Sequence, residues 1–306
     1  EGQWNLTRDQ LESIYECKFK DYSYYEQWHN WRDVEYVMEA YQQRYGSINE
    51  TSPAFLSIGF FWQKDSEEST SSIEVNDQQL GILDVGSCNG ELPHPLKLLK
   101  DESIYLVQTD PFIDKSKQEK NCYQIKCALS DSNSSNVPFY IYSGLGGSGS
   151  SLFMQNYDFV QQNYESLSRQ GEPSLNTTWF ERSQLEKTVF VETVTVDTLI
   201  YDIIREPVPI PILKIDSQGA EMKVLLGAKR YLEEKCQLIH LELFNKPMYV
   251  GIALAGEVTG FLSSIGFKLM KKFPPHGSFN SQFDAVFVKS SLDKQTLSTY
   301  QNLYLS

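Results

Sequence analysis

Short apolar runs alternate with helix-sized segments from about residue 80 onward, and no other feature constrains the fold of this chain as strongly. Each run has the length of a strand, and each intervening segment is long enough for a crossover helix. Strands separated by helices pair in parallel, with helices covering both faces of the sheet. The pattern predicts a doubly wound α/β sheet. Its predicted strands are residues 80–86, 104–110, 122–130, 211–216 and 238–244.

Further strand patterns flank this series. Residues 137–144 and 187–196 read as additional strands, and residues 266–273 and 283–289 read as an antiparallel pair near the end of the sheet. We therefore expect one α/β domain over residues 79–290. Residues 291–306 are then a C-terminal tail.

The region before this domain, residues 1–78, has a different texture. Two amphipathic patterns, over residues 5–19 and 30–46, predict a helical extension that is rich in Trp and Tyr. Such aromatic side chains form a core or docking seam, or stack on a sugar or a cofactor. A polar, apolar-poor stretch at residues 63–79 reads as an exposed linker.

Charge and composition exclude some classes of function. The 306 residues carry a formal net charge of -13, which argues against binding a nucleic-acid backbone or an anionic membrane. No apolar run reaches the length of a membrane span. The five cysteines fit no zinc pattern, so no metal site is predicted from them.

The compartment and the oligomeric state stay open at this level. No signal peptide is visible, although the chain starts at a residue other than Met. The sequence is compatible with the cytoplasm or with the lumen of the secretory pathway. Four N-x-[ST] sequons favour the lumen slightly, at Asn5, Asn49, Asn133 and Asn176.

The first predicted strand runs into a glycine turn. Gly86 and Gly90 enclose Cys88 in a G-x-C-x-G spacing, which is shorter than the G-x-G-x-x-G of pyrophosphate-binding folds. A ligand without a diphosphate therefore fits better than NAD. Asp110 ends the second predicted strand, 20 residues past Gly90, where a carboxylate accepts hydrogen bonds from ribose hydroxyls. The structural alternative is a turn aspartate before Pro111.

After the third strand, Ala128 and Leu129, with Ser130, are candidates to flank an adenine ring. A glycine- and serine-rich stretch at residues 144–159 follows. Its Ser148, Ser150 and Ser151 are candidates to contact the cofactor carboxylate or an acceptor. The alternative is that this stretch is only a flexible connector.

A series of motifs resembles the FkbM-type S-adenosylmethionine-dependent methyltransferases over about residues 80–290. In chain order, the motifs are LDVGSCNG, TDP, CALSD, GSSLF, VETVTVDTLI, LKIDSQGAEMKVLLGA and IHLELF. The resemblance implies a Rossmann-like methyltransferase sheet and S-adenosylmethionine as cofactor. It also implies that Asp110 holds the ribose and that Ala128 and Leu129 lie by the adenine. The residues implied to line the methionine end are Asp84, Gly86, Ser87, Asn89 and Gly90.

Two positions depart from the family pattern. The acidic residue often seen before the glycine of the KID-x-x-G block is Gln218 here, and the Glu-Pro often seen after the second strand is Asp110-Pro111. Aspartate keeps the carboxylate but shortens its reach. Gln218 removes a charge from the fourth-strand turn.

Two carboxylates are expected at the same edge of the sheet. In the methyltransferase sheet implied by the resemblance, the strands ending at Asp216 and Glu242 lie side by side, next to the first strand. Lys214 shares strand parity with Asp216, and His240 with Glu242. An alcohol needs to lose its proton to become a good nucleophile, so Asp216, Glu242 or His240 is the candidate base.

Several alternatives accompany this assignment. Lys214 holds Asp216 ionised, or it pairs structurally with Glu221 or Asp84. Asp216 caps the following helix, and His240 is a core histidine. Glu221 supports the pair from the following helix. Two carboxylates can also hold a divalent cation, although no third ligand stands out.

The sequence and the resemblance together predict an O-methyltransferase that acts on a hydroxyl of a sugar, a glycan or a small natural product. The alternative is a non-catalytic binding module on the same scaffold. An NAD-linked oxidoreductase is disfavoured by the short glycine turn.

Overall fold

The computed structural model describes residues 80–87, 92, 96, 104–119, 121–144, 147–204 and 209–305. The predicted N-terminal extension lies outside these residues, as do Asn89 and Gly90 of the glycine turn. Ile73–Ser306 forms one compact unit.

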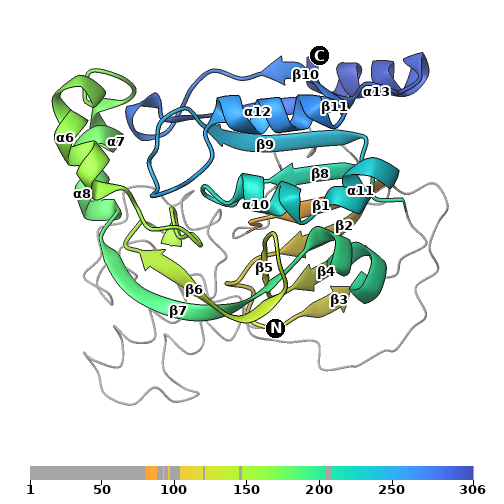
Figure 1. Cartoon of the computed structure of the whole chain (residues 1–306), viewed down its shortest axis with the longest axis horizontal. Coiled ribbons are helices and arrows are strands. Elements are labelled where there is room, and N and C mark those ends of the chain that lie inside the picture. Colours follow the sequence, from red (N-terminus) through yellow and green to blue (C-terminus); the bar gives the residue numbers. More distant parts are fainter. Residues whose placement is uncertain are drawn as a thin grey trace, which may run out of the picture. The chain divides into compact units, whose positions relative to one another are not determined.

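An eight-stranded, mostly parallel sheet lies at the centre of this unit (Figure 1). The strand order is β10-β11-β9-β8-β1-β2-β4-β3. Strands β4, β2, β1, β8 and β9 run in parallel, and β11 is antiparallel to both β9 and β10. The predicted mixed α/β sheet is therefore confirmed. The bounds are β1 (Leu80–Val85), β2 (Ile104–Thr109), β3 (Lys117–Glu119), β4 (Cys122–Ile125), β8 (Ile212–Ile215), β9 (Leu238–Phe244), β10 (Phe267–Lys272) and β11 (Gln282–Lys289).

A second sheet has three strands in the order β5-β7-β6: β5 (Ala128–Leu129), β7 (Leu185–Val194) and β6 (Ser134–Tyr142). The prediction of one continuous strand over residues 122–130 was therefore wrong. A tight turn, closed by a 3.0 Å hydrogen bond from Cys127 N–H to the Ile125 carbonyl, separates β4 from β5. The backbone then pairs with β7 instead of β2.

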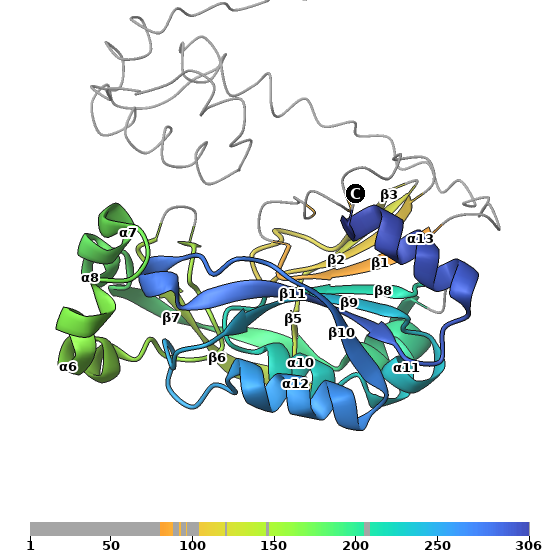
Figure 2. The same cartoon turned by 90° about the horizontal axis from the view of Figure 1, so that it is seen from above.

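Helices cover both faces of the main sheet (Figure 2). Helices α10 (Glu221–Leu226), α11 (Lys229–Glu234) and α12 (Ala255–Ser264) lie on one face, and α13 (Lys294–Leu305) lies on the other. The short α9 (Val196–Thr198) and η3 (Leu199–Ile204) follow β7. The segment predicted as a C-terminal tail thus contains a packed helix.

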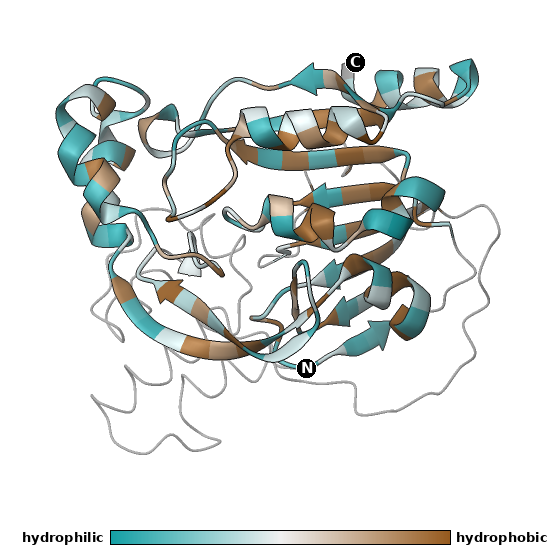
Figure 3. Ribbon diagram, in the orientation of Figure 1, coloured by the Kyte–Doolittle hydropathy of each residue, from teal (hydrophilic) through white to brown (hydrophobic). Residues whose placement is uncertain are grey.

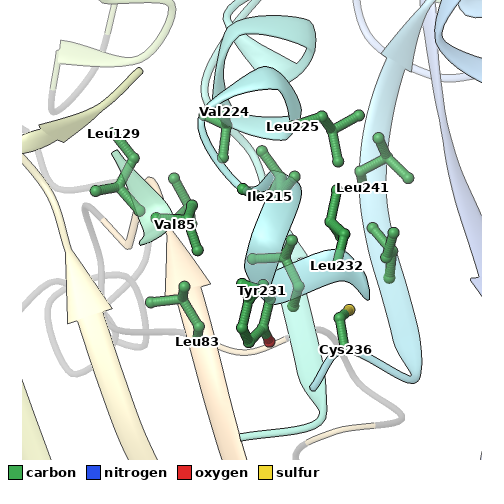
Figure 4. Packing of buried hydrophobic residues seen from close by; sticks show 14 of the residues in the cluster. Leu83, Val85, Leu129, Ile215, Val224, Leu225, Tyr231, Leu232, Cys236 and Leu241 are labelled. Carbon is green, nitrogen blue, oxygen red and sulfur yellow. The ribbon is translucent and has the colours of Figure 1, made fainter. Parts of the chain in front are cut away.

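The largest hydrophobic cluster lies between the sheet and helices α10 and α11 (Figure 4). Leu83, Ile215 and Leu241 face Val224 and Leu232 there. Strands β8 and β9 are buried along their whole length, as is typical of central parallel strands. Figure 3 shows both strands as predominantly hydrophobic, with hydrophilic bands that interrupt β9. These bands raise the question of what holds polar side chains in a buried strand.

A smaller cluster fills the opposite face. Ile82, Ile212 and Leu238 pack with Tyr300 and Tyr304 of α13. Because successive strand residues point to opposite faces, Asp84, Lys214 and His240 share this face with Ile82, Ile212 and Leu238.

A third cluster lies toward the carboxyl ends of the parallel strands. Helices α6 (Tyr157–Leu167), α7 (Pro173–Thr177) and α8 (Trp179–Arg182) lie on the side toward which β8 and β9 point (Figure 1), together with the 3-10 turn η4 (Ser278–Asn280). Val160 and Trp179 pack against Tyr249 and Phe279, which ties α6 and α8 to the loops at this edge of the sheet.

Candidate active site

The glycine turn after β1 meets the turn after β8. Gly86 has a φ of +76°, and a Cβ atom at this position would lie 1.8 Å from the Asp216 carbonyl oxygen. Only glycine adopts this conformation without strain and also allows so close an approach. The Asp216 N–H donates to the Val85 carbonyl at 3.0 Å, so the two turns are joined.

The turn after β1 is also joined to the ends of β2 and β4. Gly86 N–H donates to the Thr109 carbonyl at 2.9 Å, and Asp110 N–H donates to the Ile125 carbonyl at 3.3 Å. Asp110 is buried, and its Oδ1 accepts a 2.7 Å hydrogen bond from Phe112 N–H. Ala128 and Leu129 are buried just beyond β4. The residues predicted for a nucleoside therefore lie along one edge of the sheet, and Asp110 also stabilises its turn.

Asp84 and Lys214 form a buried ion pair of 2.9 Å between neighbouring strands β1 and β8. Asp84 has 0% exposure, so it lies beneath the glycine turn and not along its surface, contrary to the expectation that it lines a ligand. Lys214 also contacts the Gly86 carbonyl at 3.4 Å. Of the alternatives considered for Lys214, the one observed in the structure is the ion pair with Asp84. The pair with Asp216 is not formed.

This ion pair continues into two amides, the buried Gln108 and the half-buried Gln124. Gln108 donates to Asp84 at 3.2 Å, and Gln124 donates to Gln108 at 3.0 Å. Burial alone would lower the pKa of Lys214, but the Asp84, Asp216 and Glu242 carboxylates together raise that pKa. Lys214 is therefore a structural cation under the turn.

Asp216 and Glu242 are brought together by one side chain. Gln218 Nε2 donates to Asp216 Oδ1 at 2.8 Å and to Glu242 Oε2 at 2.9 Å. The Tyr249 hydroxyl lies 3.1 Å from Gln218 Oε1 and 2.9 Å from the Gly149 carbonyl oxygen, so it connects the Gln218 amide to the backbone at Gly149. The two predicted carboxylates are thus neighbours at the carboxyl edge, as the strand order implied.

The environment of Glu242 disfavours its ionised form. Burial raises the pKa of Glu242 well above its usual value, and Asp216, Glu221 and Asp284 raise it further. The hydrogen bond from Gln218 acts in the opposite direction. Glu242 therefore holds a proton more tightly than an exposed glutamate does.

Glu221 lies in the first turn of α10 and supports the turn that carries Gln218. Its Oε1 accepts hydrogen bonds from Ser217 N–H at 3.2 Å and Gly219 N–H at 3.1 Å. Burial raises the pKa of Glu221 to about 7, although these hydrogen bonds partly oppose the shift. This matches the supporting role expected for Glu221.

His240 lies one step deeper than Glu242 on the same face of β9. Its Nδ1 is 3.1 Å from the Tyr304 hydroxyl of α13, its ring stacks on Phe273, and its Nε2 is 3.4 Å from Asp284 Oδ1. With only 3% exposure, His240 is enclosed between the sheet and α13. Of the two alternatives for His240, a catalytic base or a core histidine, this geometry supports the core histidine.

Three residues that the sequence analysis did not single out complete the site. Gln282 Nε2 lies 2.6 Å from Glu242 Oε1, and His276 Nε2 lies 3.0 Å from Asp284 Oδ2 and 3.9 Å from Glu242 Oε1. The hydrogen bond to Asp284 raises the pKa of His276. The third residue is Tyr249. None of them lies in a recognisable motif, since each comes from a loop or from the antiparallel β11.

The glycine- and serine-rich stretch, residues 144–159, contacts the turn that carries Gln218. Ser151 has no exposed surface, and its hydroxyl donates to the Gln218 backbone carbonyl at 2.6 Å. Gln218 has a φ of +51°, so its backbone is held in the left-handed region. Ser150 accepts a hydrogen bond from Tyr142 N–H at 3.2 Å. Both serines therefore hold backbone in place.

The chemistry of this edge fits S-adenosylmethionine. A buried carboxylate follows β2, where ribose hydroxyls bind in doubly wound sheets, and apolar Ala128 and Leu129 lie beyond β4. The glycine turn stands between them and the Asp216–Glu242 pair. Within the residues described, no three His, Cys, Asp or Glu side chains are grouped to hold a metal ion. That same part of the chain contains no helix long and apolar enough to cross a bilayer.

The comparison with family models identifies one family. The model described as "Methyltransferase FkbM domain" matches residues 84–269. No curated protein matches the chain. A solved structure titled "Methyltransferase FkbM from Methylobacillus flagellatus KT" has 11% identity and a TM-score of 0.40, over 69% of this chain. This chain spans only 44% of that structure's length. A human methyltransferase 10 domain containing protein has 12% identity and a TM-score of 0.28, over 86% of this chain and 99% of its own.

Proposed function

Because this chain belongs to the FkbM methyltransferase family, we propose that it is an S-adenosylmethionine-dependent O-methyltransferase whose acceptor is a hydroxyl of a sugar, a glycan or a small natural product. The observation that carries the proposal is the pairing of Asp216 with Glu242 beside the glycine turn at Gly86. A carboxylate at this position suits removal of a proton from an alcohol.

The cofactor side of the proposal uses the turn and the strand ends near it. S-adenosylmethionine supplies an electrophilic methyl group on a sulfonium. Gly86 and Ser87 line its methionine end together with Asn89 and Gly90, which lie outside the described residues. Asp110 holds the ribose hydroxyls, and Ala128 and Leu129 flank the adenine. Asp84 and Lys214 act from beneath by holding the turn in shape.

The acceptor side uses the ends of β8 and β9. Asp216 would accept the hydroxyl proton of an acceptor held at this edge, and bound S-adenosylmethionine would supply the methyl group, its sulfur retaining the electron pair of the carbon–sulfur bond. A positioned base typically contributes about 10²- to 10⁴-fold to such a step. Aligning the acceptor with the methyl group contributes further.

Isothermal titration calorimetry tests the cofactor. We expect S-adenosylmethionine to bind and NAD to show no comparable affinity. Absence of S-adenosylmethionine binding, or tight binding of NAD, would refute the proposal.

A tritiated-methyl transfer assay against a panel of glycans and metabolites tests the activity. We expect label uptake that falls about 100-fold or more in Asp216→Asn. The exposed Asp158→Asn is a matched control and keeps full activity. A protein that binds the cofactor but labels no acceptor would instead favour a binding module.

A further inference from the structure

Gln218 links the two carboxylates of the site in a way that a glutamate at this position cannot. A glutamine amide carries two N–H donors, and here one is directed to Asp216 and the other to Glu242. On its other side, Gln218 Oε1 meets the Tyr249 hydroxyl, which also contacts the Gly149 carbonyl oxygen. Reversing the amide would turn Oε1 toward Asp216 and Glu242, and an ionised carboxylate there would lose its donor.

The second partner of Glu242 is less constrained. Gln282 contacts Glu242 Oε1 at 2.6 Å, a distance that an O–H···O hydrogen bond also adopts. Reversing the Gln282 amide presents its carbonyl oxygen to Glu242. A proton on Glu242 Oε1 then has an acceptor at the right distance.

The charges around Glu242 also favour a proton there. Negative groups face it from three elements, and the Lys214 ammonium is already paired with Asp84. His276 lies 3.9 Å away but is hydrogen-bonded to Asp284. The groups that face Glu242 are Lys214 and Asp216 at the end of β8, Gln218, Glu221 of α10, Tyr249, His276, and Gln282 and Asp284 of β11.

We propose that Gln218 is a positioning residue that gives the two carboxyl groups unequal roles: Asp216 is the proton acceptor, and Glu242 is a neutral acid that donates to Gln282. This inference rests on the proposed function for its catalytic consequence. Its structural content, a protonated Glu242, holds in the protein without cofactor or acceptor.

A titration of the full chain tests the structural part without any activity. Glutamate labelled with ¹³C at the side-chain carboxyl is followed by NMR across pH, and Glu242→Gln identifies the resonance of Glu242. We expect that resonance to keep the shift of the acid form at neutral pH. Titration of Glu242 near the ordinary glutamate pKa of 4.5 would overturn the proposal whether or not the protein is an enzyme.

Kinetics of two isosteric variants test the unequal roles. Glu242→Gln replaces a neutral acid with a neutral amide, so kcat should fall by less than about tenfold, whereas Asp216→Asn should lower kcat by about 100-fold or more. Equal losses in the two variants would contradict the assignment. If the wild-type protein neither binds S-adenosylmethionine nor transfers methyl groups, the proposed function fails, and the NMR titration still decides the protonation of Glu242.

Two substitutions of Gln218 test the positioning role. Gln218→Asn keeps an amide and tolerates the positive φ, but it is too short to bridge both carboxylates. We expect a lower kcat with an unchanged KM for S-adenosylmethionine. Gln218→Glu adds a third carboxylate and should move the pH–rate profile to higher pH. Gln301→Glu adds the same charge on the exposed side of α13 and should leave the profile in place. An unchanged profile in Gln218→Glu would contradict the proposal.

Discussion

The asparagine side chains of two of the four sequons, Asn133 and Asn176, are held by hydrogen bonds to specific partners. Asn176 is buried, its amide donates to the Ser168 and Gln170 carbonyls, and its Oδ1 accepts from Phe279 N–H. Asn133 is exposed, but its amide donates to the Thr198 hydroxyl at 2.9 Å. A glycan on Asn176 is incompatible with this fold, so that sequon reports on structure and not on compartment.

Breaking the Asp84–Lys214 pair should be costly. Lys214→Met leaves the Asp84 carboxylate buried opposite an apolar side chain, and loss of one partner of a buried pair typically costs about 3–5 kcal/mol. Urea unfolding measures this cost. The exposed pair Lys223–Asp131 is the control, and Lys223→Met should cost less than about 1 kcal/mol.

The double variant Lys214→Met with Asp84→Asn separates charge from packing. It should recover part of the lost stability because no unpaired charge remains. Additive losses in the double variant, or a Lys214→Met cost no larger than that of Lys223→Met, would contradict this explanation.

Glu221 should make the protein less stable as the pH rises. Its pKa is about 7 in the folded state against an ordinary value of 4.5, so the folded state binds the proton more tightly. The stabilisation from that proton is complete below pH 4.5 and is lost as the pH rises to about 7, on the order of 3 kcal/mol. Denaturant unfolding at pH 5 and pH 8 measures the difference.

Glu221→Gln is the matched variant for this effect, because its Oε1 still accepts from Ser217 and Gly219 and carries no charge. Its stability should depend less on pH over the same range, and the exposed Glu186→Gln should behave as the wild type does. Equal slopes in wild type and Glu221→Gln would show that another group is responsible.

At the scale of elements, α13 closes the sheet face that carries His240. Tyr300 and Tyr304 are buried against Ile212, Leu238 and Val286. We expect Tyr304→Ala to cost about 3 kcal/mol or more, because it opens a cavity and removes the hydroxyl that meets His240.

Two further variants apportion this cost. Tyr304→Phe keeps the ring and should cost only about 1–3 kcal/mol, and the exposed Thr299→Ala should be nearly neutral. Thermal or urea unfolding distinguishes them. If Tyr304→Ala were as stable as Thr299→Ala, α13 would not be part of the core.

For the whole molecule, Ile73–Ser306 forms a compact unit that contains all three hydrophobic clusters found among the described residues. A protein made of residues 73–306 alone should therefore fold and unfold cooperatively. Circular dichroism and thermal unfolding compare it with the full chain. A shortened protein without a cooperative transition would show that its stability depends on the residues removed.

The local sequence determined the central strands, the glycine turn at Gly86 and the two carboxylates at the ends of β8 and β9. These features depend on short-range periodicity and on strand parity, which neighbouring residues set. Strand parity also grouped Lys214 with Asp216 and His240 with Glu242, whereas the shared face of Lys214 and His240 depends on the register of β8 against β9.

Only the tertiary structure decided what each polar group contacts. Lys214 pairs with Asp84, which is 130 residues away in the sequence. His240 contacts Tyr304 on α13, in a segment that the sequence analysis described only as a C-terminal tail. The bend between β4 and β5, and the convergence of Gln218, Tyr249 and Gln282 on the carboxylates, depend on how distant strands and loops pack. Such contacts are selected by burial and hydrogen-bond satisfaction in the assembled fold, which no local pattern encodes.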